Sequence, residues 1–387
     1  MELTSPQVMW RPIYAVAAGA TLFTAVQGLT YPLLSLVLHE RGVHEGLIGI
    51  NTSMMPLGMI MSAPFASRMI PRVGALGFAI ATVCGSVACL MLLGAISNSW
   101  WWMPIRFTLG LLLASLFVVT DTWVNQLAAE SSRGRVLGFY SMLTSIGFAL
   151  GPAILVVVGT RGWGPFVAGA ACGLLSLVPL LISRRGLPPA IKERGSPLVS
   201  FIFTSPVLLA SAAASALADQ VAMSMLPIFT LHYGMSVIAS SVTLVFMVAG
   251  CIALQYPVGW LADRISRRAV YLGCSVATAV GAALLPFAAT FPPLLWLLVF
   301  VWGGAYYGIY TLSLVILGER FKGAALVTGN AVFAAMWGVG GLTGTPLAGE
   351  AMQALGPYGL AMCLAGVFVL LSVAIALTPD RQAPVPA

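Results

Sequence analysis

Charge is what this sequence has least of. Only 7% of its 387 residues are Asp, Glu, Lys or Arg, whereas a soluble domain carries about 25%. Hydrophobic residues make up 59% of the chain. A soluble fold of this composition could not cover its surface with polar groups. The composition therefore excludes a soluble domain and indicates a protein that lies largely within a bilayer.

Other absences narrow the function. The six cysteines lie inside apolar runs without a CxxC spacing, which indicates small buried side chains. No GxSxG motif occurs, and GLTGTP lacks the Lys of a phosphate-binding loop, so neither hydrolase chemistry nor ATP-driven pumping by this chain is expected. The net charge of +7 is not gathered into a basic patch with interleaved aromatics, so no nucleic-acid partner is expected. The start of the chain has no basic region before its first apolar run, which predicts an uncleaved first span.

Long apolar runs are what the sequence has instead. A bilayer core of about 30 Å is crossed by about 20 apolar residues in a helix. Twelve such runs predict an all-α membrane protein with twelve transmembrane helices in two pseudo-symmetric six-helix bundles. The predicted spans are 12–38, 46–66, 73–96, 101–129, 135–159, 163–183, 205–231, 237–258, 269–290, 292–318, 324–348 and 357–378.

The basic residues orient these spans. With both termini cytoplasmic, only Arg41 and Arg161 fall in outer loops and Arg106 falls inside a span. The other basic residues all lie on the inside, as the positive-inside rule requires. They are Arg11, Arg68, Arg72, Arg133, Arg135, Arg184, Arg185, Lys192, Arg194, Arg264, Arg267, Arg268, Arg320, Lys322 and Arg381. One span too many or too few would destroy this bias, so it supports the count.

The chain also repeats itself. The longest loop, about 183–204, separates six spans from six, and we place the division at 1–190 and 191–387. A shift of 196 residues brings Arg68 onto Arg264, Arg72 onto Arg268 and Gly85 onto Gly281, and a slightly shorter shift brings Gly147 and Gly151 onto Gly340 and Gly344. Chance matches in an Ala/Gly-rich chain explain some of these pairs but not the basic pairs at equivalent hinges. Duplicated halves are a transporter architecture.

The stretch GWLADRISRR, residues 259–268, carries a family resemblance. Over nearly the whole chain, the sequence resembles the major facilitator superfamily, whose hinge motif this stretch matches at Asp263, Arg264, Arg267 and Arg268. The resemblance implies a cytoplasmic gate here, with Arg68 and Arg72 in the first copy; the alternative is a basic loop that only obeys topology. The first copy has Ser67 in place of the Asp, which predicts a weaker or differently closed gate in that half.

Two further motifs match the family in part. RFTLG, which begins at Arg106, resembles an Arg motif of the fourth helix. Gly138, Gly147, Gly151 and Pro152 have the spacing of a fifth-helix motif associated with antiporters, although its closing Gly pair is absent. Small residues at such spacing let helices approach closely whatever the direction of transport. The chain most resembles small bacterial members that carry RF, an acid fifteen residues on, and an RGR hinge.

Three ionisable residues, Arg106, Asp121 and Asp219, lie deep inside predicted spans, where each costs about 2.5–3.5 kcal/mol. Arg106 and Asp121 share one helix face but lie about 22 Å apart along it, so they cannot pair. The resemblance implies that helices one, four, seven and ten line a central cavity. We predict that all three residues border it, with Asp121 as principal proton or cation carrier and Asp219 as second. The alternative for Asp121 is a structural charge held by Gln126 or water, and Arg106 fits substrate contact and structural pairing equally well.

The remaining cavity candidates are amides and aromatics that suit a cationic or amphiphilic organic molecule. Each fits helix packing as well as cavity lining. They are Gln27, Tyr31, Asn125, Gln220, Tyr306, Tyr307, Tyr310 and Trp337. The histidines His39, His44 and His232 fall at outer span ends, where exposed loop positions are favoured over a metal site.

Three functions remain open on the sequence. The favoured one is a secondary transporter that exports a small organic molecule by proton antiport. The second is a proton-coupled importer of a nutrient or metal chelate, and the third is a membrane scaffold or receptor. An intramembrane enzyme is not expected, because no nucleophile, base and metal ligands converge. We expect no cofactor besides a proton gradient, contact with membrane lipid, a monomer, and a bacterial inner-membrane location.

Overall fold

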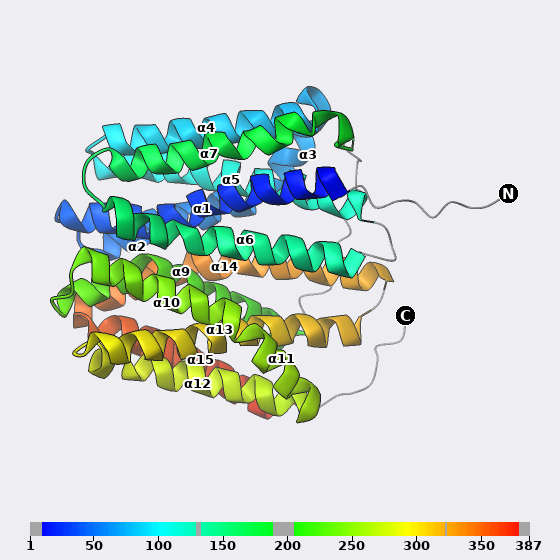
Figure 1. The fold of residues 1–387 in the computed structure, drawn as a ribbon. Coiled ribbons are helices and arrows are strands. Elements are labelled where there is room, and N and C mark those ends of the chain that lie inside the picture. The colour runs from blue at the N-terminus through cyan, green and yellow to red at the C-terminus, as the bar shows by residue number, and fades with distance from the viewer. Residues whose placement is uncertain (1–9, 129–132, 189–204, 322, 379–387) are drawn as a thin grey trace. The chain divides into compact units, whose positions relative to one another are not determined.

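The fold is taken from a computed structural model that describes residues 10–128, 133–188, 205–321 and 323–378. Figure 1 shows the long helices that these residues form. The elements are α1 Trp10–Glu40, α2 Glu45–Ile60, α3 Ser62–Val73, α4 Ala75–Ala95, α5 Ser99–Leu127, α6 Arg133–Val158, α7 Gly164–Ile182, the short 3₁₀ helix η2 Arg184–Gly186, α9 Pro206–His232, α10 Val237–Ala253, α11 Gln255–Arg264, α12 Arg267–Ala288, α13 Pro292–Arg320, α14 Gly323–Leu355 and α15 Tyr358–Leu377.

The helices account for the predicted spans. Among the described residues, ten helices are long and apolar enough to cross a membrane when α10 and α11 count as one, and the bent pair of α2 and α3 brings the number to eleven. The remaining predicted span corresponds to α14, whose 33 residues exceed the length that a bilayer core requires. The twelve-helix prediction is confirmed.

Proline explains two breaks that the predicted spans lacked. Pro64 has no N–H for the carbonyl of Ile60, the last residue of α2, and the helix axis turns by 48° between α2 and α3. Pro257 stands in the same relation to Ala253, the last residue of α10. Spans two and eight thus both break at a proline, although Pro257 lies three positions before the residue that the repeat aligns with Pro64.

The hinge residues are more helical than the predicted spans imply. Arg68 and Arg72 lie within α3, and the turn that follows is at Gly74, which has a φ of 76°. In the second half, α11 ends at Arg264 and α12 begins at Arg267, so only two residues separate them. The predicted spans end before these residues, whereas the helices continue past the apolar run into the basic residues.

The described chain clusters into two compact units. One contains Met1–Leu33 and Leu57–Glu193, and the other contains Leu34–Pro56 and Arg194–Ala387. The segment Leu34–Pro56 begins within α1 and ends within α2, so these two helices contribute residues to both units. The division at 1–190 and 191–387, drawn from the repeat, stays a prediction about the duplication.

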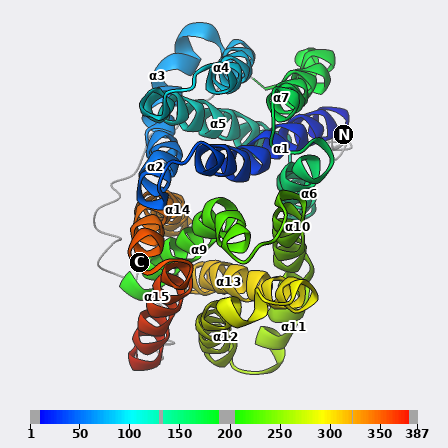
Figure 2. The ribbon, with the colours of Figure 1, turned by 90° about the vertical axis from the view of Figure 1, so that its left-hand side faces the viewer.

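Within the second unit, α9 is the central element. It packs against α10, α13, α14 and α15, and Figure 2 shows α9 next to α14, α13 and α10 when the helices are viewed end-on. Almost every residue from Leu208 to Thr230 is buried. Small side chains make this possible, because the first half of α9 is mostly Ala and Ser.

Glycines set the closest helix crossings in both units. A Cβ on Gly147 or Gly151 of α6 would overlap the backbone of α1, and Gly28 of α1 faces the backbone of α6 in return. In the second unit, a Cβ on Gly340 of α14 would overlap the Ala213 carbonyl of α9, and one on Gly344 would press on Leu217 of α9. The residues that the sequence repeat aligns therefore occupy equivalent crossings.

Gly85 and Gly281, a second pair aligned by the repeat, also lie against a neighbouring helix, whereas Gly138 of the predicted fifth-helix motif does not. A Cβ on Gly85 would press on Leu112 of α5, and one on Gly281 would press on Trp302 of α13. Gly138, by contrast, is exposed and has no described atom within 4 Å of its Cβ position. The helix-packing prediction therefore does not hold for Gly138 in the described structure, because the start of α6 has no helix pressed against that face.

Candidate functional site

Asp219 lies in the interior of the second unit. It is only 7% exposed, and the hydroxyl of Tyr306 on α13 donates a hydrogen bond of 3.1 Å to its Oδ1. The Ser215 hydroxyl, one turn earlier on α9, donates to the Tyr306 carbonyl at 3.1 Å. The two bonds fix α9 against α13, so the carboxylate has a defined position.

A thiol extends this contact. The Sγ of Cys251 on α10 donates to the Tyr306 hydroxyl at 3.2 Å, and it also approaches the Gly303 carbonyl at 3.4 Å. Sequence reasoning treated Cys251 only as a small buried hydrophobe. Its place beside a carboxylate could not be read from the sequence, because it depends on how α10 packs on α13.

Aromatic rings continue from this carboxylate along α13. Tyr306, Tyr307 and Tyr310 contact one another in sequence, with ring centroids 6.4 and 5.9 Å apart. Trp337 on α14 lies edge-on to Tyr310 at 4.8 Å and to Tyr307 at 6.4 Å. The structure thus brings together the predicted candidates of spans ten and eleven.

Gln220 adds a polar group next to Asp219. Its side chain is 2% exposed, and its Oε1 has no hydrogen-bond partner among the described residues. A buried amide oxygen without a donor costs roughly 1–3 kcal/mol, so it favours a ligand or a water that can donate. The second unit therefore offers two buried acceptors on α9, Asp219 and Gln220. Tyr307, Tyr310 and Trp337 form what we call the aromatic wall, which continues from the Tyr306 partner of Asp219.

Asp121 lies in the first unit and has a tyrosine partner of its own. The hydroxyl of Tyr140 on α6 donates to Asp121 Oδ1 at 2.7 Å, and it also lies 3.0 Å from the Thr120 hydroxyl. Asn125 donates to the backbone carbonyl of Asp121 at 2.9 Å. The observed side-chain partner is Tyr140, which sequence reasoning did not name, and not Gln126. Both Asp121 and Asn125 are exposed.

Arg106, the third ionisable residue, is fully buried in the first unit. Tyr31 on α1 is close enough to interact with it electrostatically, and the Tyr31 hydroxyl also lies 3.7 Å from Met59 Sδ. Gln27, one turn earlier on α1, is buried as well. The structure therefore groups Arg106 with Tyr31, one of the predicted candidates. That all the predicted cavity residues border one aqueous passage stays a prediction.

An ion-pair network occupies the hinge of the second half. Arg267 lies 3.5 Å from Asp263 Oδ1, and its other terminal nitrogen pairs with Glu319 at the end of α13. The Arg264 guanidinium covers the Trp260 ring at 4.1 Å. Glu319 was missed by sequence reasoning. The signal was there, because Glu319 is an acid in an otherwise basic inner segment.

Arg268 has a different role from its neighbours. Its Nη2 donates to the carbonyls of Ile375, Ala376 and Thr378 at 3.3, 2.9 and 2.5 Å. These are the carbonyls that the end of α15 leaves without helical partners. A cation at a helix C-terminus also interacts favourably with the helix dipole. Arg268 therefore ties the start of α12 to the end of α15.

The first-half hinge differs. Arg68 and Arg72 are exposed, and no ion pair to either occurs among the described residues. Ser67, which stands in place of the family's Asp, donates to the carbonyl of Pro64 in its own helix at 3.0 Å. The two copies of the motif are thus unequal in the described residues.

Removing the Arg268 cap should weaken the second unit. Arg268→Met keeps the stem but leaves three carbonyls without their donor, and we expect a loss of about 1–2 kcal/mol. The measurement is the melting temperature of the purified protein in detergent. Arg264→Met, which removes only an exposed cation–π contact, should lower it by less. Equal melting temperatures for wild type and Arg268→Met would show that the cap does not form.

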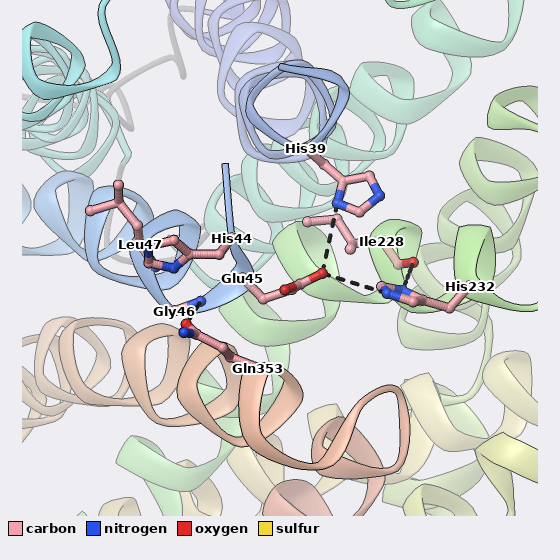
Figure 3. A network of polar contacts seen from close by, with 8 residues as sticks. All are labelled: His39, His44, Glu45, Gly46, Leu47, Ile228, His232 and Gln353. Carbon is pink, nitrogen blue, oxygen red and sulfur yellow. Dashed lines mark hydrogen bonds and ion pairs between the residues drawn. The ribbon is translucent and has the colours of Figure 1, made fainter. Parts of the chain in front are cut away.

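Two of the histidines predicted at outer span ends share a carboxylate partner. His39 and His232 both approach Glu45; His232 is exposed, as predicted, whereas His39 is only partly exposed, so the prediction of an exposed loop position was wrong for His39 alone. His44 alone faces away, with its Nδ1 accepting the N–H of Leu47 at 3.3 Å (Figure 3). No metal-binding group of three His, Cys, Asp or Glu residues occurs in the part of the chain that the structure describes.

Spanning helices in duplicated arrangement, with ionisable residues inside the spans, define a polytopic transporter-type membrane protein. The model of the Major Facilitator Superfamily matches residues 16–254 and 208–387. The chain belongs to the major facilitator superfamily, and it is a membrane transporter rather than an enzyme.

Comparisons with individual proteins support this assignment. The chain is 24% identical over 343 residues to the uncharacterized MFS-type transporter YfkF of Bacillus subtilis, covering 84% of this chain and 85% of that one. The crystal structure of nucleoside transporter NupG superposes with a TM-score of 0.77 at 13% identity, covering 94% and 98% of the two chains. That of a D-xylose-proton symporter gives 0.72 at 16% identity, covering 98% and 100%. At these identities, the solved structures share the fold alone.

Proposed function

We propose that this protein is a proton-coupled antiporter that exports a cationic or amphiphilic organic molecule across the bacterial inner membrane by alternating access. Both termini lie on the cytoplasmic side, the protein acts as a monomer, and the proton gradient supplies the energy without any other cofactor. The arrangement of Asp219 carries this proposal, because a buried carboxylate near three tyrosines and a tryptophan suits an organic cation.

Two physical arguments support a cation as substrate. The carboxylate attracts the charge, and the faces of Tyr307, Tyr310 and Trp337 offer cation–π contacts that are worth about 0.5–2 kcal/mol each. Gln220 Oε1 offers an acceptor for a donor on the substrate. A neutral sugar or nucleoside would use the amide and hydroxyl groups but would gain nothing from the carboxylate's charge.

Proton coupling follows from alternation between two loads. The protein carries the substrate cation at Asp219 in one half of the cycle and a proton at Asp121 in the other, and each load neutralises a carboxylate inside a span. Asp121 is the proposed principal proton carrier because it is more accessible than Asp219, which is buried. Tyr140 and Tyr306 each donate to one of these carboxylates and hold it in place.

The sign of the pH gradient tests the direction of coupling. In liposomes with an acidic interior, an antiporter accumulates substrate as protons leave, whichever way the protein is inserted. A symporter accumulates substrate only when the exterior is acidic. We expect a panel of lipophilic cations to accumulate with an acidic interior. Accumulation of a neutral sugar, nucleoside or metal chelate with an acidic exterior would contradict the proposal and support the importer.

The aromatic wall makes a separate prediction about affinity. Trp337→Ala removes one ring that contacts two tyrosines, and we expect the Kd of the cation to rise about 5- to 30-fold. The matched control is Trp296→Ala on the same unit, because Trp296 stacks on Phe246 at 5.4 Å, away from this wall. Isothermal titration of the purified protein measures both. Equal effects of the two changes would exclude the wall as the binding surface.

A further inference from the structure

Three helix ends meet at the outer end of the second unit. His39 lies in the last turn of α1, Glu45 is the first residue of α2, and His232 is the last residue of α9. Glu45 Oε1 is 3.9 Å from His39 Nδ1 and 3.5 Å from His232 Nε2, and Figure 3 shows the carboxylate between the two rings. The rings are 5.7 Å apart. We call these three residues the outer cluster.

The contact that the Nδ1 atom of His232 makes decides which ring nitrogen carries the hydrogen in the neutral imidazole. Its Nδ1 lies 3.0 Å from the Ile228 carbonyl, which can only accept, so Nδ1 carries a hydrogen. In a neutral imidazole, Nε2 would then be a bare acceptor facing an acceptor oxygen of Glu45. The contact is attractive only when a proton lies on Nε2 or on the carboxyl group. This geometry therefore favours one proton more than a neutral ring and an ionised carboxylate carry together.

The surroundings favour one such proton and oppose a second. The helix dipoles place partial positive charge at Glu45 and partial negative charge at both histidines, which stabilises an ion pair of this polarity. Two imidazolium rings in contact would repel each other, and the cluster has one carboxylate to balance them. The site is thus built for a single exchangeable proton.

The other charged groups at this end are few. Glu40 acts electrostatically on His39 and is followed directly by Arg41. On α14, Glu350 and Gln353 lie beside Gly46, whose N–H donates to Gln353 Oε1 at 3.3 Å. Tyr233 follows His232, and a phenol stays neutral in the range where imidazoles titrate. None of these groups provides the proton between Glu45 and His232.

The proton lies where the segment Leu34–Pro56 contacts α9. Leu34–Pro56 precedes the central loop in sequence but packs within the second unit, and the outer cluster joins it to α9. We propose that the outer cluster is a proton-binding latch: protonated, it holds Leu34–Pro56 to the second unit, and loss of the proton releases it. Only the joined state places Glu45 against His232, so the shared proton and the joined state favour each other. By linkage, we expect the joined state to be favoured at low pH and weakened as the pH rises.

Hydrogen exchange of the full-length protein in nanodiscs tests the latch. Exchange of peptides from Leu34–Pro56 is normalised to the intrinsic rate at each pH and compared at about pH 5.5 and about pH 7.5, on either side of the usual histidine range. We expect protection to fall about fivefold or more at the higher pH. Peptides from α12 and α15 should show no such change.

Three variants test whether the outer cluster causes the pH dependence of exchange. Glu45→Gln and His232→Gln should each abolish the pH dependence, and having two makes the test robust if one folds poorly. His44→Gln should keep the wild-type response, because His44 faces away from the cluster and its Nδ1 already accepts a backbone N–H. A wild-type segment whose protection ignores pH, or a response that survives both Glu45→Gln and His232→Gln, would overturn the latch. The inference goes beyond the proposed function, since it holds for any substrate, direction or coupling ion.

Discussion

Asp121→Asn is expected to reduce proton-driven exchange in liposomes to the level of liposomes without protein. Asn keeps the shape of the side chain and an oxygen that can accept the hydrogen bond from Tyr140, whose hydroxyl lies 2.7 Å from Oδ1 of Asp121. The contact between α5 and α6 therefore survives. What it loses is the ability to bind and release a proton. The measurement is substrate movement after a pH gradient is imposed across the liposome membrane.

Counterflow separates proton coupling from substrate binding. With labelled substrate outside, unlabelled substrate inside and no gradient, a protein that lacks only its proton carrier still exchanges one substrate for another. We expect Asp121→Asn to retain this counterflow, whereas Asp219→Asn, next to Gln220 and near the aromatic wall, should lose both activities. Tyr140→Phe serves as the matched control, because it removes the hydrogen bond but leaves the carboxylate titratable and so keeps gradient-driven exchange. Unchanged gradient-driven exchange in Asp121→Asn would refute its role as carrier.

The sequence predicted the features that each helix carries by itself. A span is a property of one contiguous run, so all twelve could be counted, and the glycines of the repeat could be paired without knowing what they touch. The positions of Arg106, Asp121 and Asp219 inside spans were evident for the same reason. The breaks at Ile60 and Ala253 also had a local cause, in Pro64 and Pro257. They were missed because proline is ordinary in transmembrane helices and does not by itself announce a break.

The partners of these residues could not be predicted. Tyr140 and Asp121 are nineteen positions apart and Tyr306 and Asp219 eighty-seven, and each pair meets only because two helices pack in one rotation and register. Periodicity gives the direction of a side chain from its own axis but not the residue that faces it. Glu45 and His232 illustrate the same limit, since the helix ends that join them come from opposite halves of the sequence.

Gly151→Ala and Gly340→Ala should be among the most destabilising single-methyl changes in the protein. The added carbon would overlap the backbone of α1 at Gly28 in one unit and the Ala213 carbonyl of α9 in the other. Backbone atoms cannot move aside as a flexible side chain can, so the helices must separate along the whole crossing. We expect each change to cost about 3 kcal/mol or more, the upper end for overpacking. Melting temperature and the yield of monodisperse protein measure the effect.

Two other glycines provide controls of opposite sign. Gly138 on α6 and Gly366 on α15 are exposed, with no described atom within 4 Å of the Cβ position. Because Ala favours a helix over Gly by about 1 kcal/mol, Gly138→Ala and Gly366→Ala should leave stability unchanged or raise it. Identical chemistry at four glycines would thus give opposite results, decided only by whether a second helix backbone lies against the site. If Gly151→Ala melts like Gly138→Ala, α1 and α6 do not cross as closely as the structure shows, and the equivalence of the two crossings fails with it.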